Sequence, residues 1–206
     1  MASYFDSIPG HLASWIEAQP MFFVATAPSG DAGHVNLSPK GLDTFRIVDP
    51  GTVAYLDLVG SGAETIAHLR QNGRIVVMFC GFDQPRRILR IWGEGRALFP
   101  GDPQHSLLAG SFPEIPGSRS IIRVDIRKVG TSCGGGVPLM QMISDRDYLP
   151  AWAEKKGPDA MWEYQKENNA RSLDGLPAME FMTRQQLGSR VREGAWGSSG
   201  RVRQVR

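Results

Sequence analysis

Cysteine is scarce in this sequence, with two residues in a chain of 206. So few cysteines do not provide a disulfide framework, and their scarcity fits a reducing cytoplasm. Cys80 lies within the apolar run IVVMFC and is expected to be a buried, small apolar residue. Cys133 lies in the loop stretch TSCGGG and is expected to be exposed. A reactive thiol at Cys133 is one interpretation, but no neighbour in sequence would lower its pKa, which favours a loop cysteine without a special role.

Long apolar runs and an excess of one charge are also missing. The longest apolar run, IVVMFC, is far shorter than the roughly 18 residues of a membrane-spanning helix. The N-terminal residues contain neither a basic region nor the apolar core of a secretory signal. The formal net charge is +2, which does not indicate a nucleic-acid partner. We therefore expect a cytoplasmic protein without a membrane segment.

The sequence does contain many turn residues, with 24 Gly and 14 Pro, and an ordinary hydrophobic fraction of 41%. Alternating apolar patterns between these turns predict strands at 21–27, 34–40, 43–48, 52–58, 74–80, 87–99 and 120–130. Short connections favour antiparallel pairing, and Gly93 and Gly95 inside one long strand indicate a bulge or bend. A small closed or half-closed barrel is the architecture that fits.

Four helical stretches flank these strands. The first is predicted over residues 3–18, because Ile8, Leu12, Trp15 and Ile16 make one apolar stripe. The second is 61–72, with Gly73 as its C-terminal cap, followed by a short helix in 101–110 and a helical pattern over 144–170. After about residue 183 the composition becomes basic and loses its periodicity, which is typical of a mobile tail.

The stretch HVNLSPKG, residues 34–41, places polar side chains on one face of a predicted strand. His34, Asn36, Ser38 and Lys40 alternate with apolar residues, although apolar strands surround them in sequence. One interpretation is a ligand-binding face on which Lys40 contacts an anion. The alternative is a half-exposed sheet in which Lys40 is a solvated strand end and the other residues bond to protein partners.

A second informative stretch, VAYLDLVGSGAETIAHL, runs from a strand through a glycine turn into a helix. Gly60 and Gly62 resemble the start of a Rossmann fingerprint, but the third glycine is missing and the neighbouring strands are joined by turns. Ser61 and Glu64 match a capping box, which would explain both residues without a ligand. The helix start could equally bind a phosphate through free N–H groups at 62–64, with the Ser61 and Thr65 hydroxyls as further donors.

These stretches, together with RILRIWGEGRAL, resemble the pyridoxamine 5'-phosphate oxidase-like, FMN-binding split-barrel proteins over roughly residues 20–130. The later TSCGGGVPLMQM and KENNARSLDGLP are similar to a subgroup of that family with its own C-terminal region. The resemblance implies a mainly β (α+β) fold, a six-stranded antiparallel split β-barrel with flanking helices, and a homodimer with FMN at its interface. It divides the chain into an FMN-binding domain (1–135), a C-terminal helical extension packed on the barrel (136–182) and the mobile basic tail (183–206).

The resemblance also implies where FMN would lie. The strand 34–40 would follow the flavin, and the turn and helix start at 60–65 would hold the phosphate. The implied cofactor-binding residues are Asn36, Leu37, Ser38, Lys40, Tyr55, Ser61, Gly62, Ala63 and Thr65. The chain departs from the true oxidases at Glu64 and Thr65, where they carry an Arg-Lys pair, so arginines from elsewhere would have to complete the phosphate site.

The function that this resemblance implies is an FMN-dependent oxidoreductase acting on a small molecule. The substrate is expected to differ from pyridoxamine phosphate, because the Trp-Arg-Leu-type C-terminal segment of the true oxidases has no counterpart here. A non-catalytic flavin-binding sensor or store is an alternative, as is the same fold binding haem or a deazaflavin. No metal site and no protein nucleophile are predicted, and His34 is only a candidate proton donor.

Overall fold

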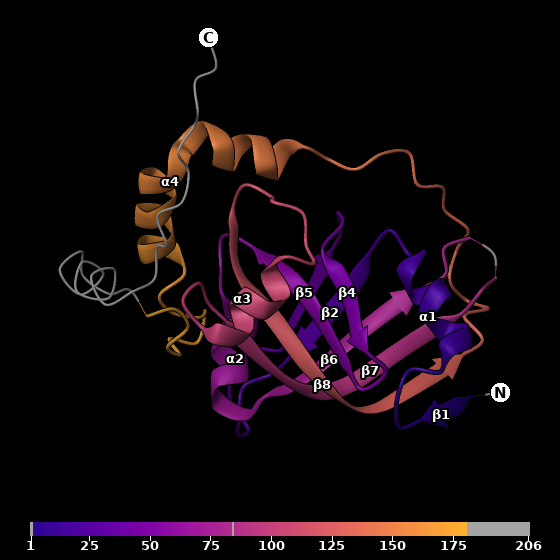
Figure 1. Ribbon diagram of the computed structural model, residues 1–206. Helices are drawn as coiled ribbons and strands as arrows, with labels where there is room; N and C mark the ends of the chain where they lie inside the picture. The colour runs from indigo at the N-terminus through magenta and orange to yellow at the C-terminus, as the bar shows by residue number, and fades with distance from the viewer. Residues whose placement is uncertain (1, 84, 181–206) are drawn as a thin grey trace, which may run out of the picture.

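One antiparallel sheet forms most of the protein, and a computed structural model describes it within residues 2–83 and 85–180 (Figure 1). Its strands are β1 (Ser3–Phe5), β2 (Phe22–Thr26), β3 (Asn36–Lys40), β4 (Phe45–Asp49), β5 (Thr52–Leu58), β6 (Arg74–Cys80), β7 (Ile88–Leu98) and β8 (Ser118–Ser132). Hydrogen-bonded neighbours follow the order β3-β2-β6-β7-β8-β5-β4, and β1 pairs with β8. The mainly β, antiparallel prediction is confirmed.

The sheet is folded over but not closed, because β3 and β4 end the order and do not pair among the described strands. It has eight strands, one more than the sequence pattern predicts and two more than the six-stranded barrel that the resemblance implies. The long strands β7 and β8 allow the fold-over, and their register shifts between Trp92 and Gly93, which confirms the predicted bulge. A Cβ atom on Gly93 would lie 2.5 Å from the carbonyl oxygen of Asp125, so the bend requires glycine.

The two halves of the folded sheet enclose one apolar core. Phe22, Phe45, Tyr55 and Phe79 come from β2, β4, β5 and β6, and their ring centroids lie between 4.9 and 5.7 Å apart in the contacting pairs. Aromatic pairs at such separations add to the stabilisation from burial alone. This cluster fixes the strands that carry the polar residues described below.

Four helices flank the sheet in the described residues: α1 (Gly10–Glu17), α2 (Glu64–Asn72), α3 (Pro103–Ala109) and α4 (Tyr148–Asn168). The first helix is shorter than predicted, since residues 3–5 extend the sheet as β1, but the expected apolar stripe of α1 is buried. Gly73 caps α2 in the left-handed conformation with φ of 68°, as predicted. None of the described helices is both long and apolar enough to cross a membrane.

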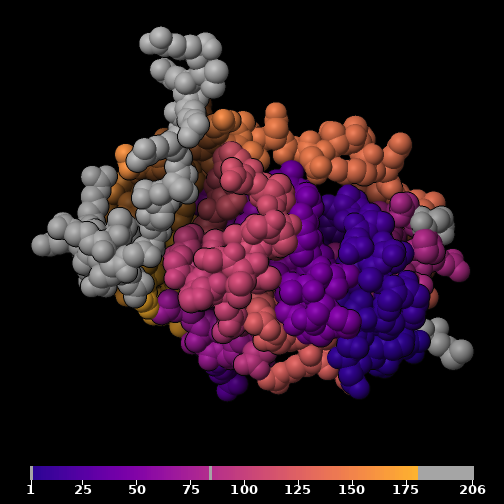
Figure 2. All heavy atoms as spheres, in the orientation of Figure 1, coloured from indigo at the N-terminus to yellow at the C-terminus, as the bar shows by residue number. Residues whose placement is uncertain are grey.

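Residues 133–180 form three successive parts. An extended strap, residues 133–147, leads from β8 to α4 and lies along the upper edge of the molecule in Figure 2. The helix α4 bends at Gly157, and its residues Ala153 and Met161 bury against Val59 at the end of β5. The clasp loop, residues 169–180, then returns to the sheet. Of the extension expected at 136–182, α4 therefore accounts for the helical part, and the tail 183–206 lies outside the described residues.

Candidate functional site

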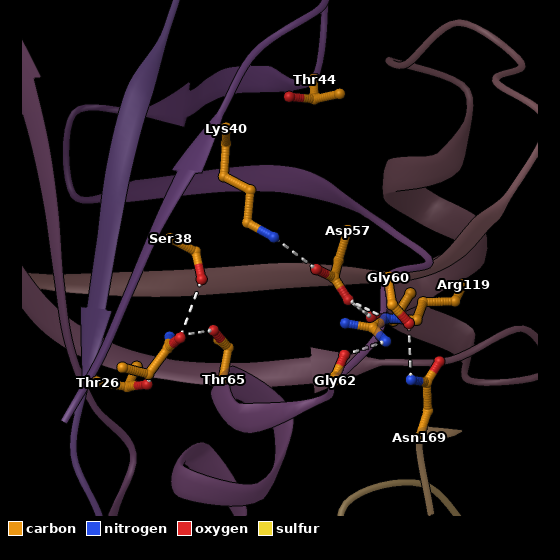
Figure 3. Close-up of polar contacts among 12 residues, drawn as sticks. Thr26, Ser38, Lys40, Thr44, Asp57, Gly60, Gly62, Thr65, Arg119 and Asn169 are labelled. Atoms are coloured by element: carbon orange, nitrogen blue, oxygen red, sulfur yellow. Dashed lines mark hydrogen bonds and ion pairs between the residues drawn. The ribbon is translucent and has the colours of Figure 1, made fainter. Parts of the chain in front are cut away.

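A cleft of about 730 Å³ lies at one end of the folded sheet. Most of its lining comes from three parts of the chain: β3 and the turn that follows it, the end of β5 with the glycine turn and the start of α2, and the strap with the start of α4. Pro20, Met21 and Arg119 of β8 complete the lining. Its volume is within the usual range of about 300–1,000 Å³ for small-molecule sites. Figure 3 shows the polar residues at its floor.

The floor of the cleft is built around Asp57, which is completely buried in β5. Its carboxylate accepts hydrogen bonds from Arg119 Nε at 2.6 Å, Lys40 Nζ at 3.3 Å and the Ser120 hydroxyl at 3.3 Å (Figure 3). The register of β5 against β8, in which Asp57 is opposite Ser120, brings these groups together. The cluster therefore joins three strands through one buried carboxylate.

The charges of this cluster do not cancel. Burial alone would raise the pKa of Asp57, but the nearby charges of Arg119 and Lys40 outweigh burial and hold that pKa below its usual value. The carboxylate is thus ionised at neutral pH and faces two cations. Since both Lys40 and Arg119 line the cleft, this cluster presents one excess positive charge to an anionic group, whereas Glu64, which also lines the cleft, carries a negative charge.

The glycine turn adds backbone donors beside these cations. The helix α2 begins after Ala63, and no side chain caps it, so its first N–H groups have no intrahelical partner. The predicted capping box of Ser61 and Glu64 is wrong. The Glu64 carboxylate instead accepts a hydrogen bond of 2.9 Å from the backbone N–H of Leu173 in the clasp loop, and Arg119 donates to the Gly62 carbonyl at 2.9 Å.

The polar face of β3 is a connected chain of hydrogen bonds. Ser38 donates to the Asn36 side-chain oxygen at 3.0 Å, and the Asn36 amide donates to Thr65 at 3.1 Å and Thr26 at 3.3 Å. Thr26 in turn lies 3.0 Å from Nδ1 of His68, whose pKa burial lowers. The alternative interpretation is confirmed for Asn36 and Ser38, which bond to protein partners, but it is wrong for Lys40, which pairs with Asp57. Asn36 and Ser38 also line the cleft, and ligand binding by this face stays a prediction.

Six of the nine cofactor-binding residues that were predicted line this cleft: Asn36, Ser38, Lys40, Ser61, Gly62 and Thr65. The other three lie elsewhere. Leu37 is on the opposite face of β3 and is 63% exposed, whereas Tyr55 and Ala63 are buried. The Tyr55 hydroxyl has no hydrogen-bond partner among the described residues, and burial raises its pKa well above the usual value.

Sequence reasoning missed Asp57 and Arg119, and also Asn169, whose side chain donates to the Gly60 carbonyl at 3.0 Å. A signal for the first pair was present, because a single carboxylate within the apolar strand VAYLDLV requires a partner if it is buried. The partner could not be identified, since it depends on the pairing of strands about 60 residues apart. The position of Asn169 depends on where α4 ends against the sheet.

The strap forms the remaining wall, through Met142, Ser144, Asp145 and Arg146, and the first turn of α4 adds Leu149. Only one backbone hydrogen bond of the strap to the sheet region is present in the described residues, from Met140 N–H to the Phe82 carbonyl at 2.8 Å. This wall mixes apolar side chains with one acid and one base, so it differs from the cationic floor.

The two further candidates lie outside this cleft. His34 Nδ1 is 2.6 Å from the carboxylate of Asp174 in the clasp loop, which also accepts the His34 backbone N–H. Cys133 is exposed and Cys80 is buried, as predicted. The backbone N–H of Gly135 lowers the pKa of the Cys133 thiol, an effect that the sequence did not indicate.

Comparison with known proteins agrees with this arrangement. Residues 8–133 match the family model described as pyridoxamine 5'-phosphate oxidase. The pyridoxamine 5'-phosphate oxidase family protein ustO of Aspergillus flavus is 39% identical over 201 residues, which cover 89% of this chain and 80% of that protein. The chain therefore belongs to the pyridoxamine 5'-phosphate oxidase family.

Solved structures are more distant. HupZ of Group A Streptococcus is 20% identical, with a TM-score of 0.45 over 59% of this chain and 91% of its own. A FAD-binding protein of Mesorhizobium loti is 15% identical, with a TM-score of 0.44 over 64% of this chain and 97% of its own. Neither similarity is strong enough to indicate a ligand.

Proposed function

We propose that the protein is an FMN-dependent oxidoreductase and that the cleft holds the cofactor phosphate at its floor. The observation that carries this proposal is the excess positive charge of Lys40 and Arg119 around buried Asp57, beside the uncapped start of α2. Cations and free helix N–H groups are the donors that bind phosphate in proteins. The polar row of Asn36 and Ser38 would continue along the flavin.

The residues present fit this cofactor. The cleft of about 730 Å³ has room for a molecule of drug size, and apolar side chains of β5 stand beside the polar groups. Bound FMN would supply the redox chemistry, and the chain would bind, orient and shield it. Glu64, the one carboxylate at the helix start, is engaged by Leu173, which reduces its opposition to a phosphate.

The test is a titration of the cofactor-free protein with FMN and with riboflavin. Two hydrogen bonds to the charged phosphate, at roughly 1.5–3 kcal/mol each, give FMN a preference on the order of 100-fold or more. Equal affinities would refute the phosphate assignment. A red protein after purification would favour haem as the ligand, and a bound deazaflavin would favour that cofactor. Bound FMN that no electron donor reduces would indicate a flavin-binding sensor or store.

A homodimer belongs to the same proposal. The outer face of β3, the strand at one end of the sheet, exposes Leu37 (63%), and Val35 (74%) just before the strand is exposed as well. These apolar side chains suit contact with a second copy. Light scattering on the FMN-bound protein is expected to give twice the mass of one chain. A monomer with bound FMN would contradict this part.

The substrate is expected to differ from pyridoxamine 5'-phosphate. A second phosphate would have to bind near the strap, where Asp145 is adjacent to Arg146 and would oppose it. Met142 and Leu149 favour an apolar group at that wall instead. An assay for pyridoxal phosphate formation with FMN-loaded protein checks this, and a turnover number of about 1–10³ per second would contradict it.

A further inference from the structure

The clasp loop lies outside the residues that match the family model, yet it contacts the glycine turn at the floor of the cleft. Asn169, completely buried at the end of α4, donates its side-chain amide to the Gly60 carbonyl (Figure 3). Its own backbone is fixed on both sides, because its N–H bonds to Gln165 and its carbonyl accepts from Met179. Asn169 is therefore a rigid support for the turn.

The bond to Gly60 determines the direction of the next N–H group. The carbonyl of Gly60 and the N–H of Ser61 belong to the same planar trans peptide, so they point in opposite directions. Asn169 does not line the cleft, whereas Gly60 and Ser61 do. With the carbonyl held toward Asn169, the Ser61 N–H is directed to the other side. That N–H has no hydrogen-bond partner among the described residues.

Asn169 keeps this contact although its burial is otherwise unfavourable. Its side-chain oxygen is buried and has no hydrogen-bond partner in the described part of the chain. A leucine of similar volume would avoid that unmet acceptor. The hydrogen bond that the side-chain N–H of Asn169 donates to the Gly60 carbonyl thus explains why an amide is present at this position.

We propose that Asn169 is a positioning residue that holds the Gly60–Ser61 peptide so that the Ser61 N–H faces the bound anion. The proposal rests on the proposed function, because it takes that anion to be the FMN phosphate. It gives the clasp loop a role in cofactor binding that residues 8–133 alone would not provide.

The test compares Asn169→Leu with Asn168→Leu. The control changes the neighbouring asparagine, whose side-chain amide bonds, within the described part of the chain, only to the Tyr164 carbonyl of α4. Each variant is titrated with FMN and with riboflavin. Losing one hydrogen bond to a charged group should reduce the preference for FMN on the order of tenfold in Asn169→Leu. The riboflavin affinity should stay within about twofold, and Asn168→Leu should keep the preference of the unmodified protein.

The outcomes separate this inference from the proposed function. If the unmodified protein shows no preference for FMN, the phosphate assignment itself fails. If the unmodified protein prefers FMN, three results would overturn the inference. These are an unchanged preference in Asn169→Leu, an equal loss of FMN and riboflavin affinity in that variant, or the same loss of preference in Asn168→Leu. Equal losses would mean that Asn169 only supports the fold.

A measurement on the unmodified protein covers the case in which Asn169→Leu does not fold. Amide hydrogen exchange is followed at Ser61 with saturating FMN and with saturating riboflavin. FMN should slow exchange of the Ser61 amide by at least about tenfold relative to riboflavin, since only FMN offers a phosphate acceptor. Equal exchange rates at Ser61 with the two ligands would overturn the inference.

Discussion

The two walls of the cleft are held in very different ways. The wall formed by β3, β5 and the start of α2 is joined through Asp57 and through the hydrogen-bond chain at Asn36. The wall formed by the strap exposes Met142 (49%) and Ile143 (93%) and is tied to the sheet region by one backbone hydrogen bond among the described residues. The first wall is thus preorganised by ion pairs and hydrogen bonds, whereas far fewer hydrogen bonds hold the second in the described residues.

This difference assigns a separate task to each wall. Fixed donors suit a cofactor, because a site that needs no reorganisation loses less free energy on binding. An exposed, loosely bonded wall suits selection among substrates, since substitutions there cost little stability. The family match, which ends at residue 133, contains the first wall and excludes all of the strap but its first residue.

The largest expected effect is at the buried carboxylate. Asp57→Asn leaves Lys40 and Arg119 without a compensating charge, and removing one partner of a buried ion pair typically costs about 3–5 kcal/mol of unfolding free energy. Denaturant unfolding measures this cost. The matched change on the other wall, Asp145→Asn, should stay within about 0.5 kcal/mol, since Asp145 is exposed. Similar costs at both positions would contradict the comparison.

The same carboxylate predicts a pH dependence. The pKa of Asp57 is lowered in the folded protein, so the unfolded chain binds more protons as the pH falls. Its stabilising contribution is complete above the ordinary pKa of about 4 and is lost as the pH falls through the lowered value. The stability difference between the unmodified protein and Asp57→Asn should therefore shrink in acid. A difference that grows in acid would show that Asp57 is not ionised.

How much of these walls the sequence predicted depends on how far apart in the sequence the contacting residues are. Local patterns were sufficient for the left-handed cap at Gly73 and the polar face of β3, because both follow from neighbouring residues. The pairing of Asp57 with Arg119 requires the register of β5 and β8. The bond from Asn169 to Gly60 requires the fold of α4, and the capping box failed because Leu173 competes for Glu64.

A second test removes one cation from the wall formed by β3, β5 and the start of α2. Lys40→Ala should weaken FMN binding by roughly 10- to 100-fold, which corresponds to about 1.5–3 kcal/mol for a hydrogen bond to a charged group. Asp57 keeps Arg119 and Ser120 as partners, so the fold should survive. Riboflavin affinity serves as the internal control. Lys128→Ala, which removes a lysine paired with Asp6, should leave FMN affinity unchanged.

A smaller effect of opposite sign is expected at Glu64. In Glu64→Gln the side-chain oxygen can still accept the Leu173 N–H, but the negative charge at the start of α2 is gone. A charge at a helix N-terminus is worth about 0.3–1 kcal/mol, so FMN should bind up to several-fold more tightly. The gain should diminish at high salt. Weaker FMN binding by this variant would indicate that the Glu64 charge is not near the phosphate.

The smallest effect is expected on the strap. Arg146 lines the cleft and has neither an ion pair nor a hydrogen bond among the described residues. If the strap serves the substrate and the floor serves the cofactor, Arg146→Ala should change the FMN affinity by less than about twofold and the unfolding free energy by less than about 0.5 kcal/mol. FMN titration and denaturant unfolding of Arg146→Ala are compared with the same measurements on Lys40→Ala. A loss of FMN affinity as large as that of Lys40→Ala would place the phosphate at the strap and reverse the assignment of the two walls.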